Sequence, residues 1–362
     1  MNKYLNKLLC FGFSCLLILS FSSCKFRNQH LEIETPGENI YKIVYSYHEE
    51  GLFDGTVLVA DSNGVVYKGA FGFANRNTEE LLNTNSQFYL ASVGKQFTSF
   101  AVLCLIENGN ISLEDKIVNY VPELPEIYND ITIKNLLNHT SGIPDYYNFA
   151  KLFDGFSNSD VLNVLTSVNQ LEFQPGVQYK YSNSGYVLLS VIVHRISGVS
   201  FSDYLTEKAF IKAGLTNTIV FDEDAGPIKN RAIGYSKNGN LTDYKFRTTG
   251  GGGIFSNVED LFLWHLAITQ GNIIDEQIIN IAYQPTVLKN GKIAYYGAGW
   301  EIDKKDLNHV FHTGTLDGFR TYFDRQLNNR QVIILLSNNS SDFLEEMVNK
   351  IHESLSGKPE NS

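Results

Sequence analysis

The chain has 362 residues, of which 43% are hydrophobic and 19% are charged, the composition of a folded globular protein with a large core. Its formal net charge of −10 argues against a nucleic-acid partner, because phosphate groups bind to basic surfaces. Beyond residue 24, no apolar run approaches the length of a membrane span.

The N-terminal residues have the features of an export signal. Lys3 and Lys7 precede an apolar run from residue 8 to residue 21, and small residues follow. The end of this segment is similar to a bacterial lipobox. We therefore expect residues 1–23 to be a cleaved lipoprotein signal peptide and Cys24 to carry lipid. An uncleaved anchor is the alternative, but about 14 apolar residues are few for a span.

These features predict an exported bacterial lipoprotein, anchored to a membrane through Cys24 and facing the periplasm or the cell surface. The polar residues 24–36 would form a tether, followed by one folded domain over residues 37–356. Cys104 lies in an apolar helical run, which indicates a buried, inert thiol. No cysteine pair then remains for a disulfide in the mature domain.

Both ends of this domain carry strand and helix patterns. Apolar residues have helical spacing over 38–50, and Asn63-Gly64 between two β-rich runs predicts a hairpin over 55–71. Toward the C-terminus the pattern predicts four strands and a final amphipathic helix, over residues 298–302, 310–314, 319–324, 331–337 and 342–355.

Helical patterns dominate between residues 92 and 282. Residues 96–108 are apolar on one face and end at Gly109, a suitable C-cap. Ser112, Ser200 and Ser256 each have an acidic residue three positions later, which predicts three further helix starts.

Together these elements predict an α+β fold. Strands from both chain ends would form an antiparallel sheet flanked by the N- and C-terminal helices, and residues from about 92 to 282 would form an all-helical lobe. Clefts between such lobes are common positions for active sites.

Ser92-Val93-Gly94-Lys95 follows a strand-like run and places a hydroxyl and an amine three residues apart. On a helix these side chains share one face. A serine is a weak nucleophile until a neighbouring base takes its proton, and a desolvated lysine can be that base. Alone, the pattern more often indicates an N-cap serine with a surface lysine.

A second candidate element, Tyr181-Ser182-Asn183, precedes a helical run. A tyrosinate near cations can act as a base, and an amide can orient both a lysine and a substrate carbonyl. Taken alone, these residue types also occur in ordinary turns.

The third element is His312-Thr313-Gly314-Thr315, at the end of a predicted strand. The glycine would let a substrate approach the backbone closely. The amide of Thr315 could then form an oxyanion hole with that of Ser92. His309 and His312 are three residues apart on a strand and face opposite sides, so they do not form a metal site. Neither a metal nor a cofactor is expected.

In this order, the three elements resemble the class C and D,D-peptidase-like branch of the serine β-lactamase and penicillin-binding protein superfamily. The resemblance runs from about residue 53 to residue 339. Supporting stretches are residues 53–59, Leu136 to Pro144, and Gly251 to Ser256.

The resemblance implies a role for each residue. Ser92 would be acylated, Lys95 and Tyr181 would shuttle protons, and Asn183 would orient the substrate. His312 stands where the family usually has a lysine, and a histidine is mostly neutral at pH 7. This weakens recognition of a substrate carboxylate.

We therefore expect a serine hydrolase that cleaves an ester or an amide, such as a D-amino peptide or a small ester, through an acyl-enzyme. A β-lactamase or D,D-carboxypeptidase acting on cell-wall peptides is one alternative. A non-catalytic binding or sensor domain on the same fold is another.

Two further motifs favour structural interpretations. The glycine run 250–253 lacks a following lysine, so it indicates a tight backbone turn near the cleft rather than a phosphate-binding loop. His139-Thr140-Ser141-Gly142 is typical of a turn that closes a helix, and residues 144–147 would border the pocket.

Overall fold

The structure is a computed structural model that describes residues 35–356. The predicted signal peptide, Cys24 and the tether up to residue 34 lie outside the described residues. All statements below concern the described part of the chain.

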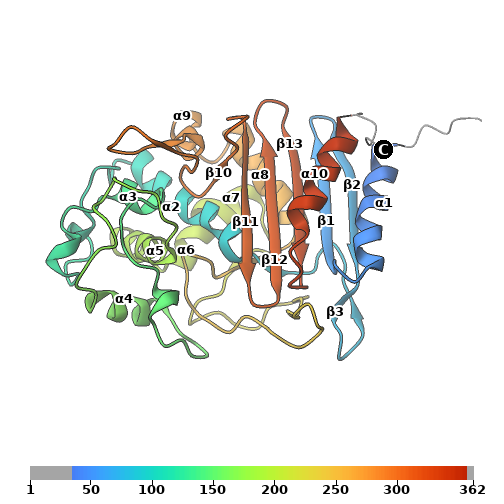
Figure 1. The fold of residues 1–362 in the computed structure, drawn as a ribbon, viewed down its shortest axis with the longest axis horizontal. Coiled ribbons are helices and arrows are strands. Elements are labelled where there is room, and N and C mark those ends of the chain that lie inside the picture. The colour runs from blue at the N-terminus through green and yellow to red at the C-terminus, as the bar shows by residue number, and fades with distance from the viewer. Residues whose placement is uncertain (1–34, 357–362) are drawn as a thin grey trace, which may run out of the picture. The chain divides into compact units, whose positions relative to one another are not determined.

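A six-stranded antiparallel sheet joins the two ends of the domain (Figure 1). Its strand order is β10-β11-β12-β13-β1-β2, so β1 from the N-terminal hairpin pairs with β13 near the C-terminus. The predicted hairpin and three of the four predicted strands are confirmed. The strands are β1 (Gly55–Asp61), β2 (Gly64–Phe71), β10 (Glu301–Ile302), β11 (His309–Leu316), β12 (Phe319–Gln326) and β13 (Gln331–Ser337).

The first of the four C-terminal strands is shorter than predicted. Residues 298–300 precede β10 as irregular chain, because the Ala298 N–H donates to the Ala282 carbonyl rather than to a sheet neighbour.

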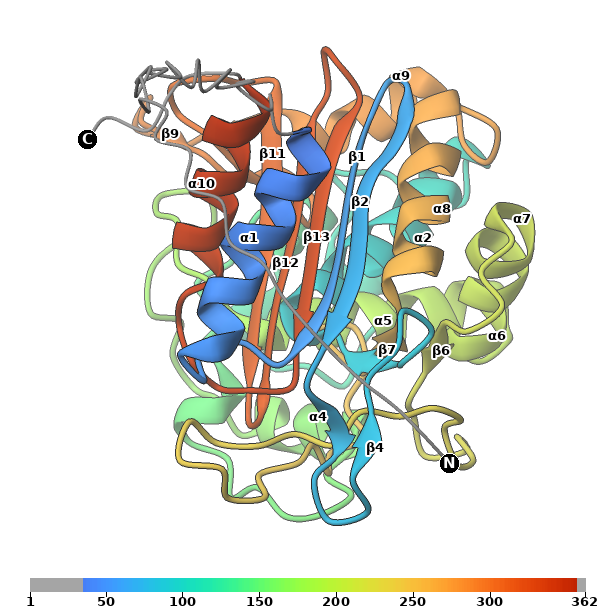
Figure 2. The ribbon, with the colours of Figure 1, turned by 90° about the vertical axis from the view of Figure 1, so that its right-hand side faces the viewer.

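Helices α1 (Pro36–Glu49) and α10 (Leu344–Leu355) cover one face of the sheet (Figure 2). Alternation along the strands explains this packing: Val57 and Val59 point toward these helices, whereas Leu58 belongs to the core on the other face. α1 begins slightly earlier than predicted. Thr35 forms a capping box with Glu38, and Pro36 occupies the first helical position.

The opposite face packs against α8 (Val258–Gln270), which contacts β1 and β13. The remaining helices lie partly beyond the β10 end of the sheet (Figure 1) and partly on the same side of the sheet as α8, as Figure 2 shows for α6 and α7. They are α2 (Lys95–Glu107), α3 (Ile133–Leu137), α4 (Asn158–Thr166), α5 (Asn183–Ser197), α6 (Phe201–Leu205), α7 (Ile211–Ala213) and α9 (Glu276–Ile279). One hydrophobic core runs from the sheet into these helices.

The stretch from 92 to 282 is therefore mixed rather than purely helical. Within it, β6 (Ile219–Val220) and β7 (Ile254–Ser256) form a small antiparallel sheet with β5 (Phe88–Tyr89). Other short strands are β3 (Phe73–Asn75), β4 (Glu80–Leu81), β8 (Thr286–Val287) and β9 (Ile293–Ala294).

Only one of the three predicted helix starts is confirmed at the predicted cap residue. Ser200 caps α6, because its hydroxyl accepts the Asp203 N–H at 2.9 Å. At Ser112 the backbone N–H donates to the Asp115 carboxylate within a turn, and no α-helix begins there. Ser256 ends β7, and the cap of α8 is Asn257, whose side chain accepts the Asp260 N–H.

Cys104 is buried in α2, and burial raises the pKa of its thiol to about 12, which agrees with the expected inert role. Within residues 35–356 no single helix has the length and apolarity to cross a membrane. The bent pair of α5 with residues 201–213 passes that test only on length and composition.

Candidate active site

Ser92 lies where the small sheet meets α2. It is in a single 3₁₀ turn, Ala91–Gly94, that leads directly into the helix, and Lys95 is the first residue of α2. The Leu90 N–H donates to the Ile254 carbonyl at 2.8 Å, which ties the turn to β7. The hydroxyl of Ser92 and the amine of Lys95 are 3.1 Å apart, so the predicted pair is in contact.

The backbone just before the nucleophile is strained. Ala91 has φ of +49°, a left-handed conformation that costs a non-glycine residue about 1 kcal/mol or more. Strand β11 holds it there. A Cβ on Gly314 would lie 2.3 Å from the Leu90 carbonyl oxygen, and Thr321 on β12 donates a hydrogen bond to that oxygen at 2.7 Å.

The absence of a side chain at Gly314 has a packing reason in this structure. It admits the chain that leads into Ser92, because a side chain there would collide with this segment. The approach of a substrate to the backbone at Gly314 stays a prediction.

Lys95 is completely buried, and its amine contacts three oxygen acceptors. They are the Ser92 hydroxyl at 3.1 Å, the Asn183 side-chain oxygen at 2.7 Å and the Gly251 carbonyl at 2.5 Å. Burial lowers the pKa of Lys95 to about 7, and the negative charge of Asp145 opposes this only in part. A large share of the lysine is therefore neutral near neutral pH.

The three acceptors fit the neutral amine as well as the charged one. A neutral amine has two N–H groups and one lone pair. Asn183 and Gly251 present only acceptor oxygens, so they take the two N–H groups. The lone pair is then directed to the Ser92 hydroxyl, which can donate its proton. In this arrangement a neutral Lys95 can accept the proton of Ser92.

Asn183 begins α5 and connects Lys95 to a carboxylate. Its side-chain oxygen accepts from Lys95, while its side-chain N–H donates to Asp145 at 2.8 Å. The backbone N–H of Asn183 donates to the same carboxylate oxygen at 2.9 Å. Because both ends of the amide are bound, its orientation is fixed.

Tyr181 is half-buried beside the pair, and its hydroxyl oxygen is buried. The Lys95 amine lies 4.8 Å from the centre of its ring, a cation–π geometry. The Tyr181 hydroxyl lies close enough to the Ser92 hydroxyl to interact with it. Within the described residues, however, the Tyr181 hydroxyl has no hydrogen bond of normal geometry. Burial raises the pKa of Tyr181 well above its usual value. The resting side chain is therefore a neutral phenol rather than the tyrosinate considered from the sequence.

His312 is also buried, and both of its ring nitrogens have protein partners. Nδ1 lies 2.7 Å from the Thr313 carbonyl and must donate to it, so Nε2 accepts from the Tyr296 hydroxyl at 3.0 Å. Burial, with a smaller effect of Lys95, lowers the pKa of His312 to about 3. His312 is thus neutral at physiological pH and has no nitrogen free for a substrate carboxylate.

A cavity of about 240 Å³ opens above Ser92. Ser92, Asn183 and Thr315 line it, so three of the predicted site residues share its wall, and both amides of the predicted oxyanion hole belong to lining residues. Thr313 and Gly314 do not line this cavity. The remaining lining residues are Tyr89, Ala91, Asp145, Tyr146, Tyr147, Asn148, Thr248, Gly251, Gly252 and Leu316.

The structure adds two residues to the candidate site. Asp145 lines the cavity, within the segment predicted to border it, and its carboxylate fixes Asn183. His139 lies in the predicted turn after α3, but its ring is 4.2 Å from that of Tyr181 and its Nδ1 accepts the Ser182 N–H. The motif at residues 139–142 predicted the turn correctly. It did not indicate that the His139 ring would pack against Tyr181.

The glycine run also has the predicted tight turn. Gly250 and Gly253 have φ of +85° and +77°, and the carbonyl of Gly251 between them points at Lys95. A Cβ on Gly252 would lie 2.4 Å from the Tyr89 hydroxyl. The segment therefore approaches the site through backbone alone.

An antiparallel sheet joined to a helical region, with this cavity at their junction, is the fold of serine β-lactamases and penicillin-binding proteins. A family model described as beta-lactamase matches residues 42–353, and the chain belongs to this family, whose members are serine hydrolases.

Among curated relatives, the chain is 33% identical to "Penicillin-binding protein 4*" of Bacillus subtilis over 81% of this chain and 70% of the relative. It is 26% identical to "Protein flp" of Staphylococcus aureus over 87% of this chain and 66% of that protein.

Solved structures confirm the fold. A penicillin-binding protein homologue from Pyrococcus abyssi superposes with a TM-score of 0.78 at 23% identity, over 88% of this chain and 77% of that one. The D-amino acid amidase of Ochrobactrum anthropi gives 0.77 at 20% identity, over 90% and 100%.

The contact between Gly314 and the chain before Ser92 can be tested by adding one methyl group. We expect Gly314→Ala to lower the acylation rate of Ser92 by roughly tenfold or more and to destabilise the fold by about 1–3 kcal/mol, because the new Cβ meets backbone and Thr321. Gly226→Ala is the control, since a Cβ there meets nothing within 4 Å. Thermal unfolding and single-turnover acylation measure both effects; equal behaviour of the two variants would contradict the constraint.

Proposed function

We propose that this protein is a serine hydrolase that forms an acyl-enzyme on Ser92. The observation that carries the proposal is the contact of Ser92 with a wholly buried lysine whose remaining hydrogen-bond partners are all acceptors. Such a lysine supplies a lone pair for the serine proton near neutral pH.

In the acylation step, the Ser92 oxygen attacks the substrate carbonyl while its proton passes to Lys95. The carbonyl carbon becomes tetrahedral, and the amides of Ser92 and Thr315 stabilise the negative charge on its oxygen. Tyr181, a neutral phenol beside both groups, relays the proton from Lys95 to the leaving alcohol or amine. Water then attacks the acyl-enzyme with the same proton path in reverse.

The electrostatics of the cavity favour a neutral or cationic substrate. Asp145 is the only charged side chain among the described lining residues. His312 is neutral and both of its nitrogens are occupied, so no cation is available there for a substrate carboxylate. We therefore propose small esters and amides of D-amino acids as substrates. The structural likeness to a D-amino acid amidase is compatible with this class but shows the fold alone.

Two alternatives are less well supported. A β-lactamase or D,D-carboxypeptidase acts on substrates with a free carboxylate, which this cavity does not neutralise. A binding or sensor domain would not need a base in contact with Ser92, and the chain retains one.

The nucleophile is tested by Ser92→Ala. Without the hydroxyl there is no acyl-enzyme, so we expect labelling by a fluorophosphonate probe to disappear and ester turnover to fall by roughly 10³-fold or more. Ser99→Ala is the matched control, because it removes a buried hydroxyl from α2, the helix that follows Ser92, outside the cavity lining. Intact-protein mass spectrometry measures the labelling, and stoichiometric labelling of a folded Ser92→Ala variant would remove Ser92 from the mechanism.

A panel of substrates, tested on the wild-type protein, separates the substrate classes. We expect wild type to hydrolyse D-alanine amide and D-alanine esters with higher kcat/KM than D-alanyl-D-alanine or a cephalosporin. Faster hydrolysis of the two carboxylate-bearing substrates would favour the cell-wall alternative while leaving the acyl-enzyme in place.

The depressed pKa of Lys95 predicts the pH dependence. The amine must be neutral to accept a proton, so acylation should rise about tenfold per pH unit below pH 7 and level off above it. Lys95→Arg should be inactive at every pH, because a guanidinium does not lose its proton. A midpoint near 7 is usual for histidine, so His312→Gln is the control. Its pKa of about 3 places His312 outside this range, and a midpoint that moved with His312→Gln would contradict the assignment to Lys95.

We also propose that Cys24 carries a lipid anchor, on the strength of the sequence pattern alone. Cys24→Ala should move the protein from the membrane fraction to the soluble fraction of cells that export it, with an unchanged rate of Ser92 labelling. Equal fractionation of variant and wild type would contradict a lipid on this residue.

A further inference from the structure

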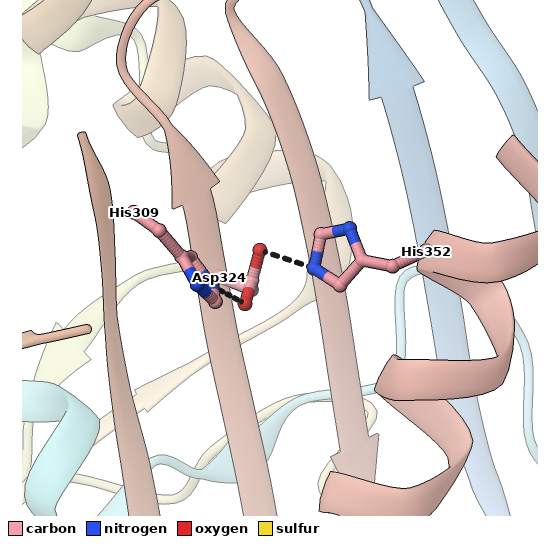
Figure 3. Close-up of side chains that lie close together, drawn as sticks. All are labelled: His309, Asp324 and His352. Atoms are coloured by element: carbon pink, nitrogen blue, oxygen red, sulfur yellow. Dashed lines mark hydrogen bonds and ion pairs between the residues drawn. The ribbon is translucent and has the colours of Figure 1, made fainter. Parts of the chain in front are cut away.

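Two histidines and one carboxylate meet on the sheet face that α10 covers, away from the candidate active site (Figure 3). His309 begins β11, Asp324 lies on β12, and His352 lies in the last turn of α10. Their nitrogen and oxygen ligand atoms all lie within 4.8 Å of one another.

The register of the sheet explains why these residues meet. Phe311 is the cross-strand partner of Asp324, and His309, two residues earlier, points to the same face as Phe311. α10 packs against β12 on this face and supplies His352 from above. His312 points to the opposite face, as its odd spacing from His309 predicts.

Asp324 is a buried charge with two partners. Its side chain is wholly inaccessible, and its two oxygens accept from His309 Nε2 at 2.5 Å and from His352 Nε2 at 3.1 Å. Both oxygens of this buried side chain therefore face imidazole nitrogens. A buried carboxylate needs positive charge beside it.

His309 has a second carboxylate behind it. Its Nδ1 lies 3.5 Å from Asp303 Oδ2, while Nε2 faces Asp324. Metal-binding histidines usually have this arrangement, in which one ring nitrogen donates to a carboxylate and the other is left to the ion. Two carboxylates beside His309 also make the position attractive to a dication.

An ion can reach this cluster from solvent. The His309 and His352 side chains are 16% and 23% exposed, whereas Asp324 is 0% exposed and closes the bottom of the cluster. The sheet separates the cluster from Ser92, so an ion here takes no part in acyl transfer.

We propose that His309, Asp324 and His352 form a zinc site that joins α10 to strands β11 and β12. Two imidazoles and a carboxylate are ligands that Zn²⁺ accepts at about 2.0–2.2 Å in a tetrahedron, with ligand atoms about 3.4 Å apart. The present separations require movements of about 1 Å, within the reach of side-chain rotation. A water molecule completes the coordination, and Nε2 protons are released to solvent when the ion binds.

A proton-bridged cluster without metal is the alternative for the same three side chains. Such a cluster would also join α10 to β11 and β12, but protons on the two imidazoles would replace the Zn²⁺ ion. Direct measurement of zinc binding distinguishes the two.

The experiment uses the full chain in detergent, stripped of metal with a chelator and titrated with zinc. We expect wild type to bind one more Zn²⁺ than the double variant His309→Gln/His352→Gln, which supplies the baseline for zinc held elsewhere on the chain. We also expect zinc to raise the melting temperature of wild type only, and Co²⁺ at this site to show the visible absorption of a tetrahedral ion.

The single variant His352→Gln should bind zinc at this site at least tenfold more weakly than wild type. His48→Gln is the matched control, because His48 is likewise a helix residue beside a carboxylate, with Asp54 at 3.2 Å, but has no second histidine. Fluorophosphonate labelling of Ser92 verifies that each variant is folded. Two outcomes would overturn the zinc site in favour of the proton-bridged cluster. One is that wild type binds no more zinc than the double variant. The other is that His352→Gln weakens zinc binding no more than His48→Gln does.

Discussion

Burial of the Lys95 amine among oxygen acceptors is the constraint on which the rest of the site depends. In water the amine would be charged, and a charged lysine has no lone pair for a serine proton. Burial makes the neutral form available near pH 7, and Asn183 and the Gly251 carbonyl accept the two N–H groups of that form. The glycine turn places the Gly251 carbonyl, the start of α5 places the Asn183 side chain, and the first turn of α2 places the amine.

The surrounding residues preserve this balance by remaining uncharged. Tyr181 and His312 lie close to the amine, and burial keeps the first a phenol and the second a neutral imidazole. A permanent cation at position 312 would lower the proton affinity of Lys95 further and would attract carboxylates. With histidine, the cavity has one negative group, Asp145, and this sets the charge of the substrates that we propose.

The order of the three elements at Ser92, Tyr181 and His312 allowed the family to be predicted. Most of the fold was predictable separately, because the periodic patterns and the hairpin signal act over short distances. Capping positions were shifted where a neighbouring residue made the better cap. His139 beneath Tyr181 and the meeting of His309 with His352 were not predictable, because both depend on which elements pack together. The spacing of residues within one strand or helix does not predict that α10 packs against β12.

The hydrophobic core that passes without interruption from the sheet into α2, α3 and α5 has a mechanical consequence. A hinge between the two walls of the cavity would have to break this continuous cluster, which includes Leu336 in the sheet and Leu189 in α5. Domain closure of the kind used by many two-lobed enzymes is therefore too costly here. Selectivity must come from the shape and charge of a cavity that already exists before the substrate arrives, with side-chain rotations as the available adjustment.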